Sequence, residues 1–204
     1  MIVLAAGEGS RLGGNKLTLP YRGSTIIQTV ITSAEKAKAE GTIVVLGYHE
    51  AEVRAALSES SVHFVTNPHP EQGMLSSVQC GIRALPNEAE AFFVLLGDQP
   101  QLNPQVFESL IAACESDNKM FIPVFKGKRG HPVLFKADTR EAILTLPLTG
   151  GLNVWRENNP ERVHLVEVET DGVLEDIDTA EDYRKALDNH SGTDGGVGSL
   201  INQD

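Results

Sequence analysis

Short apolar runs alternate with stretches of helical periodicity through the first two thirds of the chain. Four of these runs have the length of a buried strand, namely 2–5, 42–46, 62–66 and 91–96. Four other stretches repeat apolar residues every three or four positions and predict helices, namely 26 to just before 41, 50–57, 75–84 and 104–114. Strands and helices in this alternation predict a parallel sheet with helices on both of its faces.

Individual residues indicate where two helices begin, and one apolar run indicates a strand that is buried on both faces. Ser24 or Thr25 is placed to cap the first helix, and Pro104 is a favoured first-turn residue of the fourth. The run Phe92–Leu96 is apolar at every position, which is typical of a strand buried on both faces. We therefore expect this strand to lie inside the sheet.

The pattern becomes less regular after Met120. Further strands are predicted at 120–125, 132–135 and 163–168, and the first two of them flank a turn at 126–130. Helical stretches are predicted near 138–146, 152–157 and 180–187. The last sixteen residues, NHSGTDGGVGSLINQD, are rich in Gly, Ser and Asn. We therefore expect one folded domain over 1–188 and a disordered tail over 189–204.

Composition narrows the classes of partner. The chain has 204 residues, of which 41% are hydrophobic and 22% charged, as in an ordinary soluble domain. A net charge of −11 argues against nucleic-acid and membrane surfaces as partners. Cys80 and Cys114 lie in apolar helical patterns without CxxC spacing, so we expect buried, reduced thiols and a cytoplasmic protein. The first apolar run is too short for a signal peptide or a membrane span.

The stretch LAAGEGSRLGGNK, residues 4–16, is a glycine-rich loop after the first predicted strand. Its glycines do not fit the dinucleotide fingerprint, because Gly13 comes one residue late after Gly7 and Gly9. They do not fit the Walker loop either, because the lysine is displaced and the hydroxyl residue is missing. The loop is suited to bind a polyphosphate through backbone N–H groups, with Arg11 and Lys16 as cations. The alternative is a glycine-rich turn with solvated charges.

Two acidic segments add candidate metal ligands. Asp98 in VLLGDQP follows a predicted strand, at the sheet edge where open α/β sheets bind ligands. One carboxylate there suits Mg²⁺, which takes one or two protein carboxylates together with substrate phosphates. Asp176 and Asp178 are two residues apart, so on extended backbone they face the same way. The alternatives are an Asp98 that caps the next turn and an Asp178 or Thr179 that caps the last helix.

Four motifs in series resemble those of the molybdenum-cofactor nucleotidyltransferases, the MobA-like family. They are LAAGxGxRxGGxK, GDQP, the GHP of KGKRGHPVLF, and DIDTxED. The resemblance extends from Ile2 to about Leu187 and is strongest to the molybdopterin cytidylyltransferase branch. The segment NPHPEQGMLSSVQCG is similar to the part of the family under the base and ribose. Ala6 stands where the guanylyltransferase branch has glycine, so the resemblance favours cytosine.

The resemblance implies a fold, a reaction and a set of site residues. The fold is a three-layer, doubly wound α/β domain with a mostly parallel sheet, one reversed strand and a small added β element. The reaction is Mg²⁺-dependent transfer of CMP from CTP to the terminal phosphate of molybdopterin, with Mn²⁺ as a possible replacement metal and no protein nucleophile. The implied catalytic residues are Arg11, Lys16 and Asp98, and the implied metal ligands are Asp98 and Asp178. The implied nucleotide-binding residues are Leu4, Ala5, Ala6, Gly7, Gly9, Arg11, Lys16, Gly73, Ser76, Ser77 and Asp98. The implied acceptor-binding residues are Gln99, Pro100, Gly130, His131 and Asp176.

Other functions stay open at this point. One is a related nucleotidyltransferase that uses GTP or a sugar-phosphate acceptor. Another is a non-catalytic maturation factor that carries the molybdenum cofactor. His131 in the GHP motif either contacts the pterin or a phosphate, or it orders the turn. The partners we expect are small molecules, with a transient contact to a molybdenum hydroxylase or its chaperone.

Overall fold

The computed structural model describes residues 1–9, 14–37 and 39–188, and the expected tail over 189–204 lies outside them. Seven strands follow one another across the main sheet in the order β5-β4-β1-β6-β9-β7-β10, and a short β8 pairs with β7. Their bounds are Ile2–Ala5 (β1), Ile43–Leu46 (β4), His63–Thr66 (β5), Ala91–Leu96 (β6), Met120–Phe125 (β7), Lys128–Arg129 (β8), Val133–Lys136 (β9) and Val163–Glu167 (β10). Each longer predicted strand is therefore present within one residue or so at either end.

One strand of the seven runs against the others. The strands β1, β4, β5 and β6 pair in parallel, as do β7 and β10. The strand β9 lies between β6 and β7 and is antiparallel to both. The expectation of a mostly parallel sheet with one reversed strand is confirmed.

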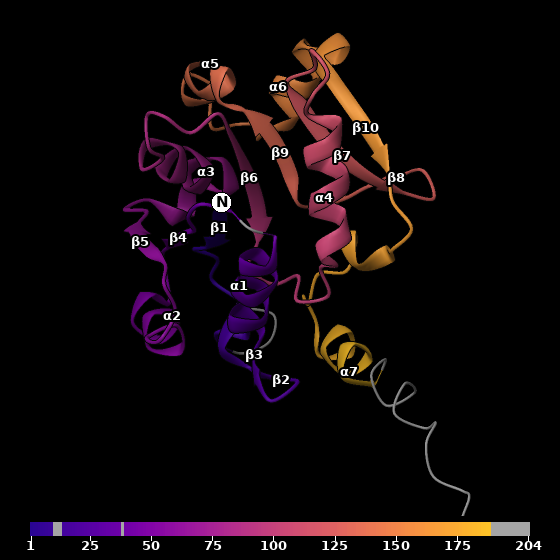
Figure 1. Cartoon of the computed structure of the whole chain (residues 1–204). Coiled ribbons are helices and arrows are strands. Elements are labelled where there is room, and N and C mark those ends of the chain that lie inside the picture. Colours follow the sequence, from indigo (N-terminus) through magenta and orange to yellow (C-terminus); the bar gives the residue numbers. More distant parts are fainter. Residues whose placement is uncertain (10–13, 38, 189–204) are drawn as a thin grey trace, which may run out of the picture.

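Helices cover both faces of the sheet, which makes three layers (Figure 1). One face carries α1 (Ile26–Lys36), α2 (Glu50–Ala56), α4 (Pro104–Ala113) and α7 (Ala180–Asp188). The other face carries α3 (Met74–Arg83), α5 (Arg140–Leu144) and α6 (Asn153–Asn158). No helix in the described part of the chain is long and apolar enough to cross a membrane.

The two hydrophobic cores take alternate residues of the central strands. In β6, Phe93 and Leu95 pack toward α1 and α4, whereas Phe92 and Val94 pack toward α3. A strand buried on both faces needs apolar residues at every position, because successive side chains point to opposite faces. This explains the uninterrupted apolar run of β6 and confirms its predicted place inside the sheet.

The apolar pattern of the sequence indicates neither of two short hairpins, although the resemblance implies a small added β element. The strands β2 (Pro20–Tyr21) and β3 (Ser24–Thr25) form a separate two-stranded sheet, which is the small added β element. The turn expected at 126–130 contains β8, which pairs back on β7. In each hairpin a two-residue loop has positive φ at both positions, Arg22-Gly23 in one and Lys126-Gly127 in the other. Strands of two residues are too short to show an alternating pattern.

The cap expected for the first helix is present in the structure. Thr25 caps α1, because its hydroxyl accepts a hydrogen bond from the Gln28 N–H at 3.2 Å.

Cys80 and Cys114 are free thiols, but both are only partly buried, which corrects the expectation of buried residues. Cys114 lies at the C-cap of α4, where the helix leaves the core. Burial nevertheless raises the pKa of both thiols above the ordinary value, so neither is an activated nucleophile.

Candidate functional site

A cavity of about 560 Å³ opens at the carboxyl ends of β1 and β6. The chain leaves β1 toward β4 on one side and returns to β6 on the other, so this edge is the switch point of the sheet. Ligands of doubly wound folds bind at such a crevice. Its wall is formed by Leu4, Ala6, Gly7, Glu8, Gly9, Asn15, Lys16, Leu17, Tyr48, Pro70, Glu71, Gly73, Met74, Ser77, Leu96, Asp98, Asp176 and Asp178.

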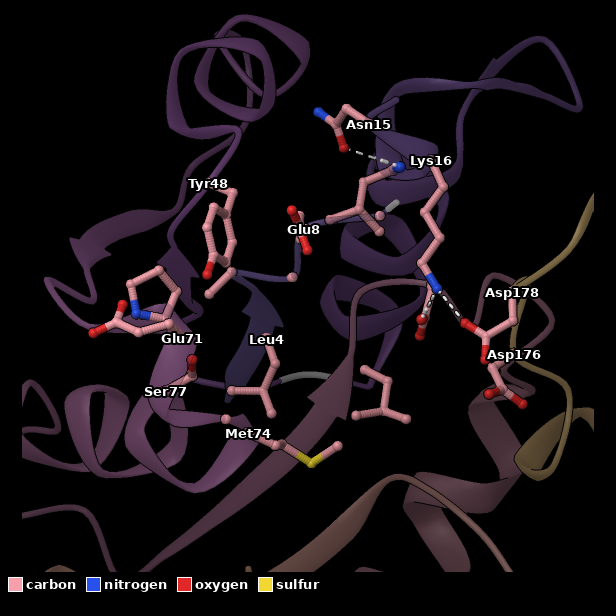
Figure 2. A pocket seen from close by; sticks show the side chains of 18 residues that line it. Leu4, Glu8, Asn15, Lys16, Tyr48, Glu71, Met74, Ser77, Asp176 and Asp178 are labelled. Carbon is pink, nitrogen blue, oxygen red and sulfur yellow. Dashed lines mark hydrogen bonds and ion pairs between the residues drawn. The ribbon is translucent and has the colours of Figure 1, made fainter. Parts of the chain in front are cut away.

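Lys16 joins two carboxylates that are far apart in the sequence. Its Nζ lies 2.5 Å from Asp98 Oδ2 and 2.6 Å from Asp178 Oδ1, and Figure 2 shows Lys16 and Asp178 meeting at one end of the cavity. Lys16 begins the short 3₁₀ helix Lys16–Thr18, and the Asn15 side chain caps that helix by accepting from the Leu17 N–H. The cap therefore fixes the direction in which the lysine leaves the loop.

The surroundings of Lys16 keep it charged. Burial lowers its pKa, but the charges of Asp98 and Asp178 and their hydrogen bonds outweigh burial, so the pKa lies above the ordinary value. The side chains of Lys16 and Asp98 are 15% and 20% exposed, so water screens this pair only in part. The alternative in which Lys16 is a solvated loop charge is therefore wrong.

The segment 171–178, which we name the C-terminal strap, carries Asp176 and Asp178 to this end of the cavity. The Ile177 N–H donates to the Asp98 backbone carbonyl at 3.0 Å, and the His131 N–H donates to the Val173 carbonyl at 2.9 Å. A Cβ on Gly130 would lie 2.2 Å from the Val173 oxygen, so only glycine permits this approach. The GHP motif thus packs against the strap that carries the first residues of the DIDT motif.

The hydrogen bonds at the start of α7 show whether Asp178 or Thr179 caps that helix. Thr179 Oγ1 accepts a hydrogen bond from the Asp182 N–H, and Asp182 Oδ2 accepts from the Thr179 N–H. This reciprocal pair is a capping arrangement, so Thr179 caps the last helix. Asp178 instead faces Lys16.

His131 lies behind the cavity wall. Burial lowers its pKa to about 4, although the nearby Asp176 charge acts in the opposite direction. A histidine with this pKa is neutral at pH 7. Its backbone holds the strap, which favours the alternative in which His131 orders the turn.

Two adjacent serines near the N-terminus of α3, Ser76 and Ser77, have different surroundings. Asn67 Nδ2 donates to Ser76 Oγ at 2.8 Å and to Ser77 Oγ at 3.0 Å. Ser76 Oγ also donates to the backbone oxygens of His69 and Gly73. Ser77 lies on the cavity wall, whereas Ser76 is committed to the loop that precedes the helix.

The structure brings most of the predicted site residues to one cavity. Those on its wall are Leu4, Ala6, Gly7, Gly9, Lys16, Gly73, Ser77, Asp98, Asp176 and Asp178. Those set back from it are Ala5, Ser76, Gln99, Pro100, Gly130 and His131. Ala5 packs in the core because the strand alternation turns it away from the cavity. Arg11 lies outside the described residues.

Several wall residues were missed, and Tyr48 is the most prominent of them. Tyr48 follows β4, a parallel neighbour of β1, and comes directly after Gly47. The rule that predicted Asp98, a polar residue beyond the carboxyl end of a central strand, applies equally to Tyr48. Pro70, Glu71 and Met74 lie in the segment 67–81, which the resemblance places under the base and ribose, although they were not named individually as site residues.

Carboxylate oxygens dominate the charged wall. Lys16 is the one lysine or arginine that the described residues place on this wall, beside Glu8, Glu71, Asp98, Asp176 and Asp178. A polyphosphate needs more positive charge than one lysine supplies. Asp98 Oδ2 and Asp178 Oδ1 converge on one cationic atom, and hard oxygen donors suit Mg²⁺ or Mn²⁺. The described residues form no cluster of three or more His, Cys, Asp or Glu ligands.

Comparisons with known proteins agree with this arrangement. The family model described as the MobA-like NTP transferase domain matches residues 1–163. The molybdenum cofactor cytidylyltransferase of Escherichia coli K12 is 30% identical over 192 residues, which cover 93% of this chain and 96% of that protein. The nicotine blue oxidoreductase of Paenarthrobacter nicotinovorans is 28% identical and covers 91% of this chain, with 95% of its own length matched.

Solved structures are similar over nearly the same span. The crystal structure of Rv0371c from Mycobacterium tuberculosis H37Rv superposes with a TM-score of 0.79 at 28% identity, covering 92% of this chain and 96% of that one. The same protein was also crystallised in complex with manganese, and that structure gives a TM-score of 0.76 at 27% identity, covering 92% of this chain and 96% of that one.

Proposed function

The chain belongs to the MobA-like NTP transferase family and is a nucleotidyltransferase, and we propose that it transfers CMP from CTP to the terminal phosphate of molybdopterin, with release of pyrophosphate. The observation that carries the proposal is the meeting of Lys16, Asp98 and Asp178 beside the glycine-rich loop, in a cavity of nucleotide size. Similarity to the Escherichia coli molybdenum cofactor cytidylyltransferase over most of both chains supports this choice of substrates.

Asp98 and Asp178 are the residues that would hold the divalent metal, Mg²⁺ or Mn²⁺. When bound, the metal neutralises phosphate charge and favours displacement at phosphorus. The crystal structure of Rv0371c in complex with manganese supports the proposal that this chain also binds a divalent metal. Lys16, which both carboxylates hold in this structure, is then free to contact the α-phosphate and the leaving pyrophosphate.

The chain itself acts by positioning and by charge. The acceptor phosphate attacks the α-phosphorus in line, so no protein nucleophile is needed. The N–H groups of the loop, together with Arg11, would hold the β- and γ-phosphates. Asp176, which lies on the cavity wall, would contact the acceptor from the strap. Gln99, Pro100, Gly130 and His131 are not on that wall and would support the acceptor end indirectly. The buried Gln99 Oε1 has no hydrogen-bond partner among the described residues.

We also propose that residues 1–188 act as a single domain in the cytoplasm, where CTP is available. The product would pass in a transient contact to a molybdenum hydroxylase or its chaperone.

Release of pyrophosphate tests the reaction. Purified protein with Mg²⁺, CTP and molybdopterin should release pyrophosphate and form a cytidylylated pterin, with GTP a much poorer donor. Sugar phosphates serve as alternative acceptors. Because one relative is an oxidoreductase, the same samples should be assayed for NADH and NADPH oxidation. Turnover with sugar phosphates alone, or nicotinamide oxidation without pyrophosphate, would refute the proposed reaction. Binding of molybdopterin without pyrophosphate release would instead favour a maturation factor.

A further inference from the structure

The cavity has a second end that the proposed chemistry leaves unexplained. Tyr48 and Met74 are 48% and 53% exposed, and both lie on the cavity wall. The other large hydrophobic residues that are exposed in the described chain lie away from this cavity, namely Ile111, Leu148, Leu165 and Leu187. Apolar surface that is exposed inside a binding cavity indicates a flat or apolar group of the ligand.

The backbone on both sides of Tyr48 is held in place. A Cβ on Gly47 would lie 2.6 Å from the Ala6 carbonyl oxygen and 2.8 Å from the Ala6 Cβ, so this glycine lets the turn after β4 contact the loop after β1. On the other side, the His49 ring is bonded through Nε2 to the Glu8 carbonyl at 2.8 Å and through Nδ1 to Glu52 at 3.3 Å. Tyr48 is therefore a residue on a fixed turn, and its ring is presented to the cavity in advance of binding.

The charges decide which part of a nucleotide faces Tyr48. Figure 2 shows the ring between Glu8 and Glu71, on the side of the cavity opposite Lys16 and Asp178. The two glutamates repel phosphate oxygens at this end, whereas Lys16, together with the divalent metal that Asp98 and Asp178 would hold, attracts them at the other. A nucleoside triphosphate therefore enters with its phosphates toward Lys16 and its base toward Tyr48.

We propose that Tyr48 is a binding residue that stacks on the nucleobase of the bound nucleoside triphosphate, with Met74 as an apolar contact on the same end of the cavity. This inference rests on the proposed nucleotidyl transfer and adds to it the residue that holds the base. Aromatic rings stack on any base, so Tyr48 supplies affinity, and the choice among bases falls to polar groups such as Ser77.

The test compares Tyr48→Ala and Tyr48→Phe with the wild-type protein. Loss of a base-stacking ring weakens binding by about tenfold, so Tyr48→Ala should raise the Kd and KM for CTP by that factor and leave kcat nearly unchanged. Tyr48→Phe keeps the stacking surface and should restore most of the affinity. Ile111→Ala is the matched control, because Ile111 is as exposed as Tyr48 but lies on α4 away from the cavity.

Inorganic tripolyphosphate separates stacking from a change in the loop. It has the phosphates of CTP but no base, so its inhibition constant should be the same for wild type and Tyr48→Ala. Equal weakening of tripolyphosphate and CTP would show that Tyr48 acts through the phosphate loop, and would overturn the inference. A raised KM for the acceptor with an unchanged Kd for CTP would assign Tyr48 to the pterin, and would overturn it as well.

The same measurements distinguish a failure of the proposed reaction from a failure of the stacking proposal. A wild-type protein that binds CTP but does not transfer it to molybdopterin contradicts the proposed reaction, and the Kd comparison of Tyr48→Ala still supports or overturns stacking. A wild-type protein that binds no nucleoside triphosphate overturns both proposals.

Discussion

Ile177 is bonded through its backbone N–H to the backbone carbonyl of Asp98, across 3.0 Å. This bond ties the C-terminal strap to the turn after β6, so the Asp178 and Asp98 carboxylates lie on either side of Lys16. Two like charges held together by backbone contacts need a cation between them, and Lys16 supplies it in this structure. In the proposed reaction the same two carboxylates would hold the metal, and Lys16 would contact a phosphate instead.

Replacement of Lys16 by methionine should remove activity and leave the fold intact. Because Lys16 would stabilise charge that grows during the reaction, kcat should fall by about 100-fold or more. Pyrophosphate release measures kcat, and circular dichroism checks the fold. Lys36→Met is the matched control, since Lys36 is an exposed lysine in the last turn of α1. Turnover of Lys16→Met at the wild-type rate would contradict the assigned role.

Ser76 and Ser77 should differ although they are adjacent. Ser77 lies on the cavity wall, so Ser77→Ala should raise the KM for CTP several-fold, and it should cost less stability than Ser76→Ala because it removes one hydrogen bond to Asn67 only. Ser76 accepts from Asn67 and donates to the loop, so Ser76→Ala should lower the free energy of unfolding by about 1–3 kcal/mol and change KM little. Urea titration and steady-state kinetics on both variants measure the contrast. The reverse pattern would show that the nucleotide contacts Ser76.

Gly130→Ala should destabilise the protein and disturb the site together. The added Cβ would lie 2.2 Å from the Val173 oxygen, so the strap must move away. Such overpacking costs about 1–3 kcal/mol, which lowers the Tm by several degrees for a chain of this size. We expect kcat to fall too, because the strap carries Asp178.

Gly41→Ala is the control for this experiment. An added Cβ there meets no atom within 4 Å, and the φ of Gly41 is not positive. Its Tm should stay the same or rise slightly. A Gly130→Ala variant with the Tm and kcat of wild type would show that the strap tolerates displacement.

Stability should depend on pH through His131. Its pKa is about 4 in the folded protein and 6.5 when unperturbed, so between these values the unfolded chain binds a proton that the folded chain does not. The free energy of unfolding should therefore fall as the pH drops from about 6.5 to 4, by at most about 3 kcal/mol. Urea titrations of wild type and His131→Gln at several pH values measure this dependence. Subtracting the free energy of unfolding of His131→Gln from that of the wild type at each pH removes the contribution of the carboxylates, which both proteins share. Parallel pH curves of the two proteins would refute the role of His131.

The long elements and the charged end of the site could be predicted from the sequence. The apolar runs of β1 and β6 have the lengths of their strands, and Asp98 and Lys16 were expected at the sheet edge where they lie. The short hairpins could not be predicted, because two-residue strands have no period. The contrast of Ser76 and Ser77 depends on how the loop before α3 folds over Asn67, and no local pattern encodes that contact.

The contacts of Lys16 with Asp98 and Asp178 also bear on the order in which the fold and the site form during synthesis. During synthesis Lys16 emerges before Asp178, which lies 162 residues further along the chain. The parallel sheet around β1 has the strands it needs long before then, but half of the carboxylate pair is still missing. A nascent chain can therefore fold the strands around β1 before it has a complete site, and we expect nucleotide binding only after the strap has emerged.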